Sequence, residues 1–398
     1  MKMTSLFLTL SAFAISANAV PPLISEMVAT TGIEAPNFGF FIFIQYVAFS
    51  MVAFSGGYLK KKWRISNYLI VAIGLGCITF SLISGGIFLH SYLSLLIWVI
   101  PLGLSGGAVE TFASIEISNL SSFDSSKNLC LSQVFYSLGA FSAPQIVYFC
   151  LGFDMGWKSI FFIFSVISLL AMIFFLFSNR HRLKLTQSTN ELHLQTKEVN
   201  FKSQNGQNLF ILLLLIMICY VIIESLSAAW LSYIFKHKFH LTTKDAALAL
   251  AAFWAGVTSS RLIIVLLPSR LTLWPTILVS SVLLSVATIV ILLAPGHIAS
   301  IIAVGLMGVA AGPIWPVIIM ISSSVFRSDK KTAIIIGMGA LGFAVGPLLG
   351  SLIINAGSIQ MFHYTQILVS LLLLLLIITA YFVNGQLSNA YLDHSKLI

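Results

Sequence analysis

Two carboxylates and one guanidinium lie inside long apolar stretches of this sequence. Glu110 ends the segment PLGLSGGAVE, Glu224 lies within YVIIES, and Arg261 follows AGVTSS. An ionisable side chain in the hydrocarbon of a membrane costs about 2.5–3.5 kcal/mol by insertion scales, so such residues are usually kept for function. Protonation removes the charge of a carboxylate and, with it, this cost. The three residues are therefore candidates for coupling a process to protons.

The depths of these three groups suggest one pairing. Counting about 1.5 Å per residue from the helix ends on one side of the membrane places Glu110 and Arg261 at a similar depth and Glu224 roughly twice as deep. Because they lie at a similar depth in the membrane, Arg261 and Glu110 could form an ion pair. The alternative for Arg261 is that its side chain reaches the membrane surface. The alternative for the carboxylates is a structural hydrogen bond to a neighbouring helix.

Other side chains on these stretches are candidates for binding a substrate. Tyr220 and Ser227 share a helical face with Glu224. Hydroxyls and an aromatic ring on one face suit a sugar, because its C–H side packs on a ring while its hydroxyl groups need partners. Gln133 and Ser137 lie one turn apart on another stretch and have groups for the same purpose.

Trp254 and Trp315 offer rings for stacking, although single aromatic residues more often serve packing.

The elements that must position these residues are membrane helices. The chain has 398 residues, of which 58% are hydrophobic and only 8% are charged, whereas about 25% are charged in a soluble domain. About 20 apolar residues cross a bilayer, and twelve runs reach that length. They cover approximately 5–27, 38–59, 66–88, 92–116, 129–152, 157–178, 208–235, 245–267, 273–293, 297–325, 331–355 and 360–384.

The formal net charge of +9 is explained by membrane topology rather than by nucleic acid. With the N-terminus in the cytoplasm, most Lys and Arg residues fall on the cytoplasmic side, as the positive-inside rule requires. Lys60–Lys62 and Arg180 are examples, whereas Lys236 and Lys238 fall outside. We therefore expect both termini in the cytoplasm, a bacterial inner membrane, a monomer in contact with lipid, and no nucleic-acid partner.

The N-terminal segment resembles a signal peptide, with a basic start, a short apolar core and the sequence Ala-Asn-Ala at 17–19. The apolar run continues through Pro21 and Pro22 to Ile24, however, so we expect a retained first helix. The sequence contains no phosphate-binding loop, no pairing of nucleophile and base, and no cluster of metal-ligand residues. We expect neither an enzyme nor a metal or cofactor.

A weak repeat divides the chain into two halves. Gly-Leu-Ser-Gly at 103–106 recurs as Gly-Leu-Met-Gly at 305–308, and Gly139 and Pro144 are matched by Gly342 and Pro347. A polar segment at 179–207 separates the halves. We therefore predict an all-α polytopic membrane protein of twelve helices in two parallel six-helix halves. The predicted parts are a bundle at 1–178, a cytoplasmic linker at 179–207, a second bundle at 208–384 and a cytoplasmic tail at 385–398.

Three segments resemble the major facilitator superfamily, and most closely its fucose permease branch of sugar–proton symporters. They are residues 103–111, ending in Glu-Thr, residues 131–140, with Gln, Phe, Ser, Gly and Ala at the same spacing, and Gly-Pro-Ile-Trp-Pro at 312–316. The resemblance places Asn18 near a proton-linked Asp of that branch and Tyr136 at a sugar-binding Asn. The superfamily's acidic residue after the second helix is also missing, because Lys60 and Lys61 stand there.

The resemblance implies proton-coupled uptake of a neutral sugar or similar small polar solute by alternating access. The residues and the resemblance together give the site candidates. The substrate-binding candidates are Asn18, Glu110, Gln133, Tyr136, Ser137, Tyr220, Glu224, Trp254 and Trp315, and the coupling candidates are Glu110, Glu224 and Arg261. The alternative is proton-coupled export of a drug or small metabolite, which the many Phe residues and the Gly-x-x-x-Gly-Pro pattern at 342–347 favour. A sensor that has the fold but does not transport is a third interpretation.

Overall fold

The computed structural model describes residues 2–59, 62–85, 92–120, 125–184, 204–266, 272–326 and 328–395, and every regular element in these ranges is helical. Most of the helices are apolar around their whole circumference, as expected when one side faces lipid and the other faces protein. The elements are α1 (Lys2–Ala17), η1 (Pro21–Leu23), α2 (Ile24–Thr31), α3 (Ala35–Leu59), α4 (Ile65–Ser84), α5 (Tyr92–Leu120), α6 (Ser125–Gly152), α7 (Trp157–Lys184), α8 (Gln204–Phe239), α9 (Thr243–Leu266), α10 (Leu273–Leu293), α11 (His297–Ala311), α12 (Ile314–Phe326), α13 (Asp329–Asn355) and α14 (Ile359–Ser395).

Within the described ranges, twelve segments are long and apolar enough to cross a membrane. Two of them are interrupted helices. The first, Met3–Thr31, combines α1, η1 and α2, and the tenth, His297–Phe326, combines α11 and α12. Prolines follow both interruptions, at Pro21 and Pro22 and at Pro313 and Pro316, since proline cannot donate the backbone hydrogen bond that would continue a helix. The predicted twelve-span fold is confirmed.

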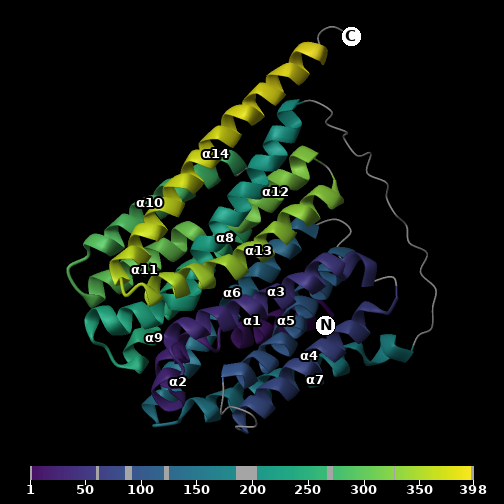
Figure 1. The fold of residues 1–398 in the computed structure, drawn as a ribbon. Coiled ribbons are helices and arrows are strands. Elements are labelled where there is room, and N and C mark those ends of the chain that lie inside the picture. The colour runs from purple at the N-terminus through teal and green to yellow at the C-terminus, as the bar shows by residue number, and fades with distance from the viewer. Residues whose placement is uncertain are drawn as a thin grey trace.

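The helices form two groups that repeat the same packing (Figure 1). In the first half, α1 packs on α6 and α7, α3 packs on α5, and α4 packs on both α5 and α7. The corresponding helices of the second half make the same pairs: α8 with α13 and α14, α9 with α11, and α10 with both α11 and α14. One repeated pair of glycines follows this correspondence: Gly139 of α6 meets Ser11 of α1, and its counterpart Gly342 of α13 meets Ile218 and Val221 of α8.

The close approach of helices within each half requires two of the repeated glycines. A Cβ atom at Gly103 of α5 would collide with the backbone of Gln45 in α3, and one at Gly308 of α11 would collide with the backbone of Phe253 in α9. Small residues let membrane helices approach to backbone contact. The repeated Gly-x-x-Gly sequence is therefore a packing feature of both halves.

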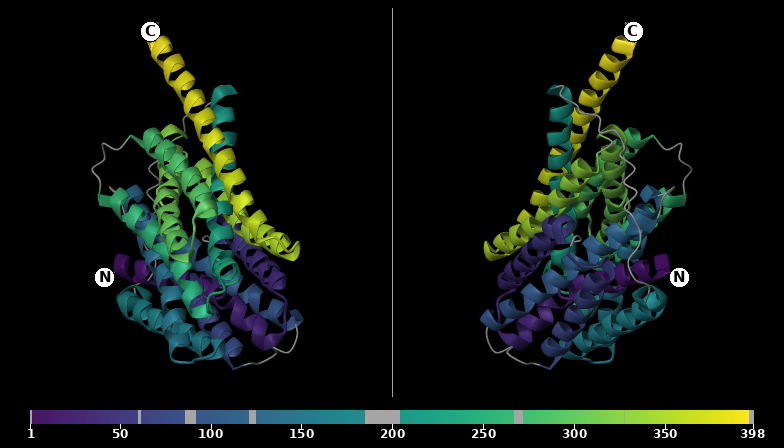
Figure 2. Two further views of the ribbon diagram at one scale, coloured as in Figure 1. Left: turned by 90° about the vertical axis from the view of Figure 1, so that its left-hand side faces the viewer. Right: turned by 90° about the vertical axis from the view of Figure 1, so that its right-hand side faces the viewer.

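The two halves meet along two pairs of helices, α3 with α13 and α6 with α9. The side views show α14 and the first turns of α8 projecting beyond the rest of the bundle (Figure 2). Most of the predicted linker at 179–207 lies outside the described residues, although α7 continues to Lys184 and α8 begins at Gln204. The predicted tail at 385–398 continues α14 as far as Ser395.

Candidate functional site

Arg261 and Glu224 form a buried ion pair between α9 and α8. A guanidinium Nη2 lies 3.2 Å from Oε1 of Glu224, and the two residues are only 2% and 1% exposed. Arg261 therefore does not reach the membrane surface. This pair takes the place of the possible pair between Arg261 and Glu110. The first turns of α8 project beyond most of the other helices (Figure 2). Counting from the start of α8 thus overestimates the depth of Glu224.

The backbone around Arg261 provides two further acceptors. Its Nε donates to the carbonyl of Gly312 at 3.3 Å, and its Nη1 donates to the carbonyl of Gln133 at 3.4 Å. The Gly312 carbonyl is available because its helical donor would be the amide of residue 316, and Pro316 has no N–H. The Gly-Pro-Ile-Trp-Pro motif thus interrupts the tenth span where the arginine needs an acceptor. The contact with Gln133 joins the C-terminal half to α6 of the N-terminal half.

Glu110 lies next to this pair, in the N-terminal half. Its Oε1 accepts a hydrogen bond from Nε2 of Gln133 at 3.3 Å, while its buried Oε2 has no hydrogen-bond partner among the described residues. Arg261 acts on Glu110 electrostatically without contacting it. Gln133 thus touches both charged groups, through its amide on one side and its backbone carbonyl on the other.

The charged cluster, defined as Glu110, Gln133, Tyr220, Glu224 and Arg261, holds two carboxylates and one guanidinium. The Tyr220 hydroxyl interacts with both Glu224 and Arg261. The described side chains of the cluster carry one negative charge in excess when both carboxylates are ionised. Because a guanidinium does not lose its proton, only a proton on a carboxylate, or a bound cation, balances the cluster.

A small central cavity lies beside the charged cluster, between the two halves. Half of its lining residues are aromatic or neutral polar, and the other half are small or aliphatic. The ring of Tyr46 in α3 stacks on Phe343 in α13 at 5.1 Å and 15°, and Tyr136 in α6 meets the edge of Trp254 in α9 at 6.2 Å. Both aromatic pairs cross between the halves. The lining residues are Ala17, Asn18, Pro21, Ile42, Tyr46, Tyr136, Ser225, Ala228, Ala229, Trp254, Phe343 and Pro347.

Tyr46 and Tyr136 connect the cavity to the charged cluster. Both line the cavity, and both lie within electrostatic range of Glu110 and Glu224. A molecule held in the cavity would therefore contact two phenol groups that also interact electrostatically with the two carboxylates. This arrangement can couple the occupation of the cavity to the charge of the cluster.

The structure distributes the predicted substrate-binding residues among these sites. Asn18, Tyr136 and Trp254 line the central cavity, and Glu110, Gln133, Tyr220 and Glu224 lie in the charged cluster. Ser137 and Trp315 belong to neither. Ser137 is fully buried and its hydroxyl donates to the carbonyl of Val134 in its own helix at 3.0 Å. Trp315 packs against Phe343 at 6.2 Å, behind the cavity wall.

Tyr46, Ser225 and Phe343 line the cavity and were missed by the sequence analysis. Tyr46 and Phe343 have no neighbouring polar motif, and only the pairing of α3 with α13 brings them together. Ser225 directly follows Glu224, so a search of the neighbours of that carboxylate would have found it.

At one end of the molecule, α13 makes close contacts with α3 and α8 beside the central cavity, which Pro347 lines. The hydroxyl of Ser351 donates to the carbonyl of Pro36, and Trp230 donates to the carbonyl of Pro347 at 2.9 Å. A Cβ atom at Gly39 would lie 2.6 Å from Ser351 Cβ and 2.6 Å from the Trp230 ring. At the same end, the Nζ of Lys244 lies over the ring of Tyr148, 4.7 Å from its centroid. We call this end the closed end.

Replacing Gly39 by leucine is expected to open the closed end, because its side chain has no room beside Ser351. The labelling rate of a cysteine at position 351 by a maleimide, in detergent and with the four native cysteines replaced by serine, should rise several-fold. The control is a cysteine at the exposed position of His297. Its labelling rate should be the same whether position 39 holds glycine or leucine. If the cysteine at 351 stayed equally protected, Gly39 would not control this contact.

Comparison with known proteins agrees with this architecture. No curated protein sequence matches the chain. The structure of a D-xylose–proton symporter superimposes with a TM-score of 0.77 at 13% identity, covering 94% of this chain and 96% of that one. A Major Facilitator Superfamily transporter, FucP, in the outward conformation superimposes with a TM-score of 0.65 at 17% identity, covering 96% and 98%.

At these identities the two structures show a shared fold, and their proteins are transporters, not enzymes. The sequence model of the Major Facilitator Superfamily itself matches residues 6–327 and 213–390. These matches extend over both six-helix halves and confirm the resemblance found in the sequence. The chain therefore belongs to the Major Facilitator Superfamily of membrane transporters.

Proposed function

We propose that this protein couples the uptake of a neutral sugar, or a similar small polar solute, to protons by alternating access. The observation that carries this proposal is the charge imbalance of the cluster beside a neutral, aromatic cavity. One proton balances the two carboxylates and the single guanidinium. A polar substrate without charge can then occupy the cavity without adding to the buried charge, whose desolvation is costly.

Glu110 is the better proton carrier of the two carboxylates. Glu224 is held by Arg261 at 3.2 Å, and this pairing stabilises its ionised form. Among the described residues, Glu110 has only a neutral amide donor, at 3.3 Å. Protonation therefore costs fewer interactions at Glu110. We assign Glu110 as the residue that binds and releases the coupling proton, and Glu224 and Arg261 as the pair that sets the charge around it.

The central cavity supports a sugar as the substrate class. Tyr46 and Trp254 present rings on which the C–H side of a sugar packs. Asn18 uses its amide nitrogen on the carbonyl of Ala14 at 2.9 Å, which leaves its carbonyl oxygen to accept a hydroxyl. The indole N–H of Trp254 has no partner among the described residues and can donate one.

Transport assays in proteoliposomes test the proposed function. An inward proton gradient should drive accumulation of one or more members of a panel of neutral sugars that includes D-xylose, and sugar addition should alkalinise the medium outside. The proton-coupled drug exporter remains the alternative, because the same rings suit an amphipathic drug. Proton-driven transport of amphipathic dyes with no response to any sugar would favour that alternative, and binding without transport would favour a sensor.

Replacing Asn18 by alanine is expected to weaken substrate binding by about three- to thirtyfold. A net hydrogen bond is worth about 0.5–1.5 kcal/mol, more with a charged partner, and about 1.4 kcal/mol is tenfold in affinity. Ser137→Ala is the matched control, because that hydroxyl lies outside the cavity. Following the tryptophan fluorescence of each variant during titration with the transported solute would measure the two dissociation constants. Equal losses in the two variants would argue against this cavity as the binding site.

The proposal includes the topology inferred from the positive residues. Both termini and the 179–207 linker lie in the cytoplasm of a bacterial inner membrane, and the protein acts as a monomer. The parts are then an N-terminal bundle at 1–178, the linker, a C-terminal bundle at 208–384 and a tail at 385–398. In this orientation the closed end faces outward. A reporter enzyme that works only in the cytoplasm should be active when it is fused after Leu397. Activity seen only with a reporter that works in the periplasm would reverse the assignment.

A further inference from the structure

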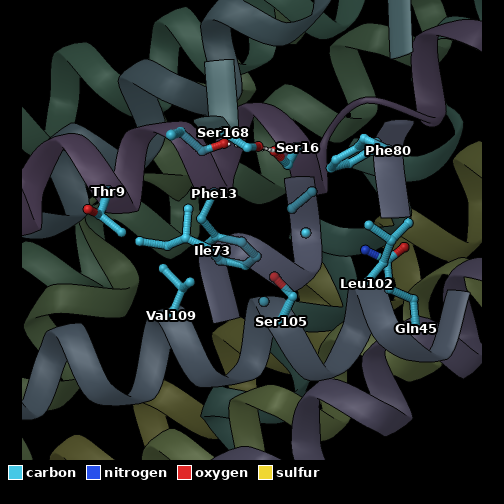
Figure 3. A pocket seen from close by; sticks show the side chains of 14 residues that line it. Thr9, Phe13, Ser16, Gln45, Ile73, Phe80, Leu102, Ser105, Val109 and Ser168 are labelled. Atoms are coloured by element: carbon cyan, nitrogen blue, oxygen red, sulfur yellow. Dashed lines mark hydrogen bonds between the residues drawn. The ribbon is translucent and has the colours of Figure 1, made fainter. Parts of the chain in front are cut away.

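A second cavity is lined only by helices of the N-terminal half. It is enclosed by α1, α3, α4, α5 and α7, and Figure 3 shows the side chains that line it. Phe13, Phe80 and other apolar residues cover much of its wall, while Gln45 and four hydroxyl groups contribute polar atoms. No charged side chain lines it. We call it the N-half cavity.

Among the residues that line the N-half cavity, Gln45 has a side-chain amide whose hydrogen bonds are not made within the described part of the protein. The residue is 8% exposed, and its amide forms no hydrogen bond with a described residue. The side chain can donate two hydrogen bonds and accept two. A buried amide is normally paired with protein or with ordered water. The Gln45 amide therefore points to a ligand in the N-half cavity.

The hydroxyls around this cavity already use their protons. Ser16 donates to the carbonyl of Ala12 at 2.9 Å, and Ser105 donates to that of Ala72 at 2.7 Å. Ser168 and Thr9 donate in the same way to carbonyls of their own helices. The hydroxyls of Ser16 and Ser168 also lie 3.4 Å from each other (Figure 3). The groups that the four hydroxyls leave for the cavity are therefore the remaining oxygen lone pairs. A ligand of this cavity must supply hydrogen-bond donors and also accept from the Gln45 amide.

The interruption of the first span adds an acceptor at the edge of the cavity. The carbonyl of Ala17, which lines this cavity, would be bonded by the amide of residue 21 in a continuous helix, but Pro21 has none. Ala17 lines both the N-half cavity and the central cavity. The two cavities are thus neighbours at the point where the first helix stops.

We propose that the N-half cavity is a binding site for water, held by Gln45 and by the oxygen atoms that line the cavity. Water both donates and accepts, which matches the acceptor-rich wall and the single amide. It is neutral, which matches the absence of a charged lining residue. Cavities that stay dry are lined by apolar groups alone, and this one is not. The bound water hydrates the break in the first helix from the side opposite the central cavity.

Radiolytic hydroxyl-radical labelling of the full-length protein tests this site, because radicals form from water molecules that are already bound beside a side chain. Phe13 and Phe80 line the cavity. Phe112 and Phe175 are 0% and 2% exposed in the same half and line neither described cavity. We expect Phe13 and Phe80 to be oxidised several-fold faster than these two controls. Equal rates at all four positions would overturn the proposal.

Gln45→Leu removes the amide that anchors the water and should reduce labelling of Phe13 and Phe80 towards the rate of Phe112. Gln366→Leu is the matched control, because Gln366 is a fully buried glutamine of the C-terminal half, and it should leave labelling in the N-half cavity unchanged. If Gln45→Leu fails to fold, Ser105→Ala removes a lining oxygen with a smaller change and should lower the same two rates. Unchanged labelling in the folded variants would show that the radicals arrive from bulk solvent and would also overturn the proposal.

Discussion

Replacement of Glu110 by glutamine is expected to abolish uphill accumulation of the substrate while preserving its exchange down a gradient. Glutamine has nearly the same shape and keeps an oxygen for the amide of Gln133, which donates to Glu110 at 3.3 Å. It cannot bind and release the coupling proton. The neutral side chain also mimics the protonated carboxyl group, so the charge of the cluster stays balanced. Substrate affinity should therefore remain close to that of the unmodified protein.

Proteoliposomes separate these two activities. Accumulation driven by a proton gradient should fall to the background level in Glu110→Gln, and counterflow of labelled substrate should persist and lose its dependence on pH. Glu34→Gln is the matched control, because Glu34 is an exposed carboxylate far from the cluster in sequence. Normal accumulation in Glu110→Gln would remove this residue from the coupling mechanism. Loss of both activities would instead give it a structural role.

The second large effect concerns the ion pair of Arg261 and Glu224. Substituting Glu224 with leucine removes the acceptor at 3.2 Å and leaves a buried guanidinium that cannot discharge itself by losing a proton. Breaking a buried pair by removing one partner costs about 3–5 kcal/mol in the free energy of unfolding. A large fall in melting temperature and in the yield of folded protein is the expected result.

The double variant Glu224→Leu with Arg261→Met identifies the cause. Replacing both members of a buried pair by well-packed apolar residues is often neutral for stability, so much of the lost melting temperature should return. Transport should not return, because the balance of charge around Glu110 has changed. A double variant as unstable as Glu224→Leu would show that packing, rather than the uncompensated guanidinium, causes the loss. Fluorescence-detected size exclusion after heating would measure all three proteins.

The sequence by itself determined the fold and the chemical identity of the charged cluster. Twelve apolar runs can satisfy their backbone groups in a bilayer only as helices, and the repeated glycines identified the two halves. Glu110, Glu224 and Arg261 were recognisable because a charge in an apolar run is costly wherever the helix lies. The interruptions of the first and tenth spans were not predicted, because the apolar runs continue through Pro21, Pro22 and Pro313.

Tertiary structure decided which of these groups meet. Arg261 lies beside Glu224 rather than Glu110. The helices do not end at one level, since the first turns of α8 project beyond most of the bundle (Figure 2), so depth counted along each helix could not identify the partner. Ser137 shares a helix with Gln133, but its hydroxyl bonds within that helix. Tyr46 and Phe343 stack although nearly three hundred positions separate them in the chain. Local spacing fixes only the face of one helix, whereas a cavity between halves depends on how helices from both of them pack.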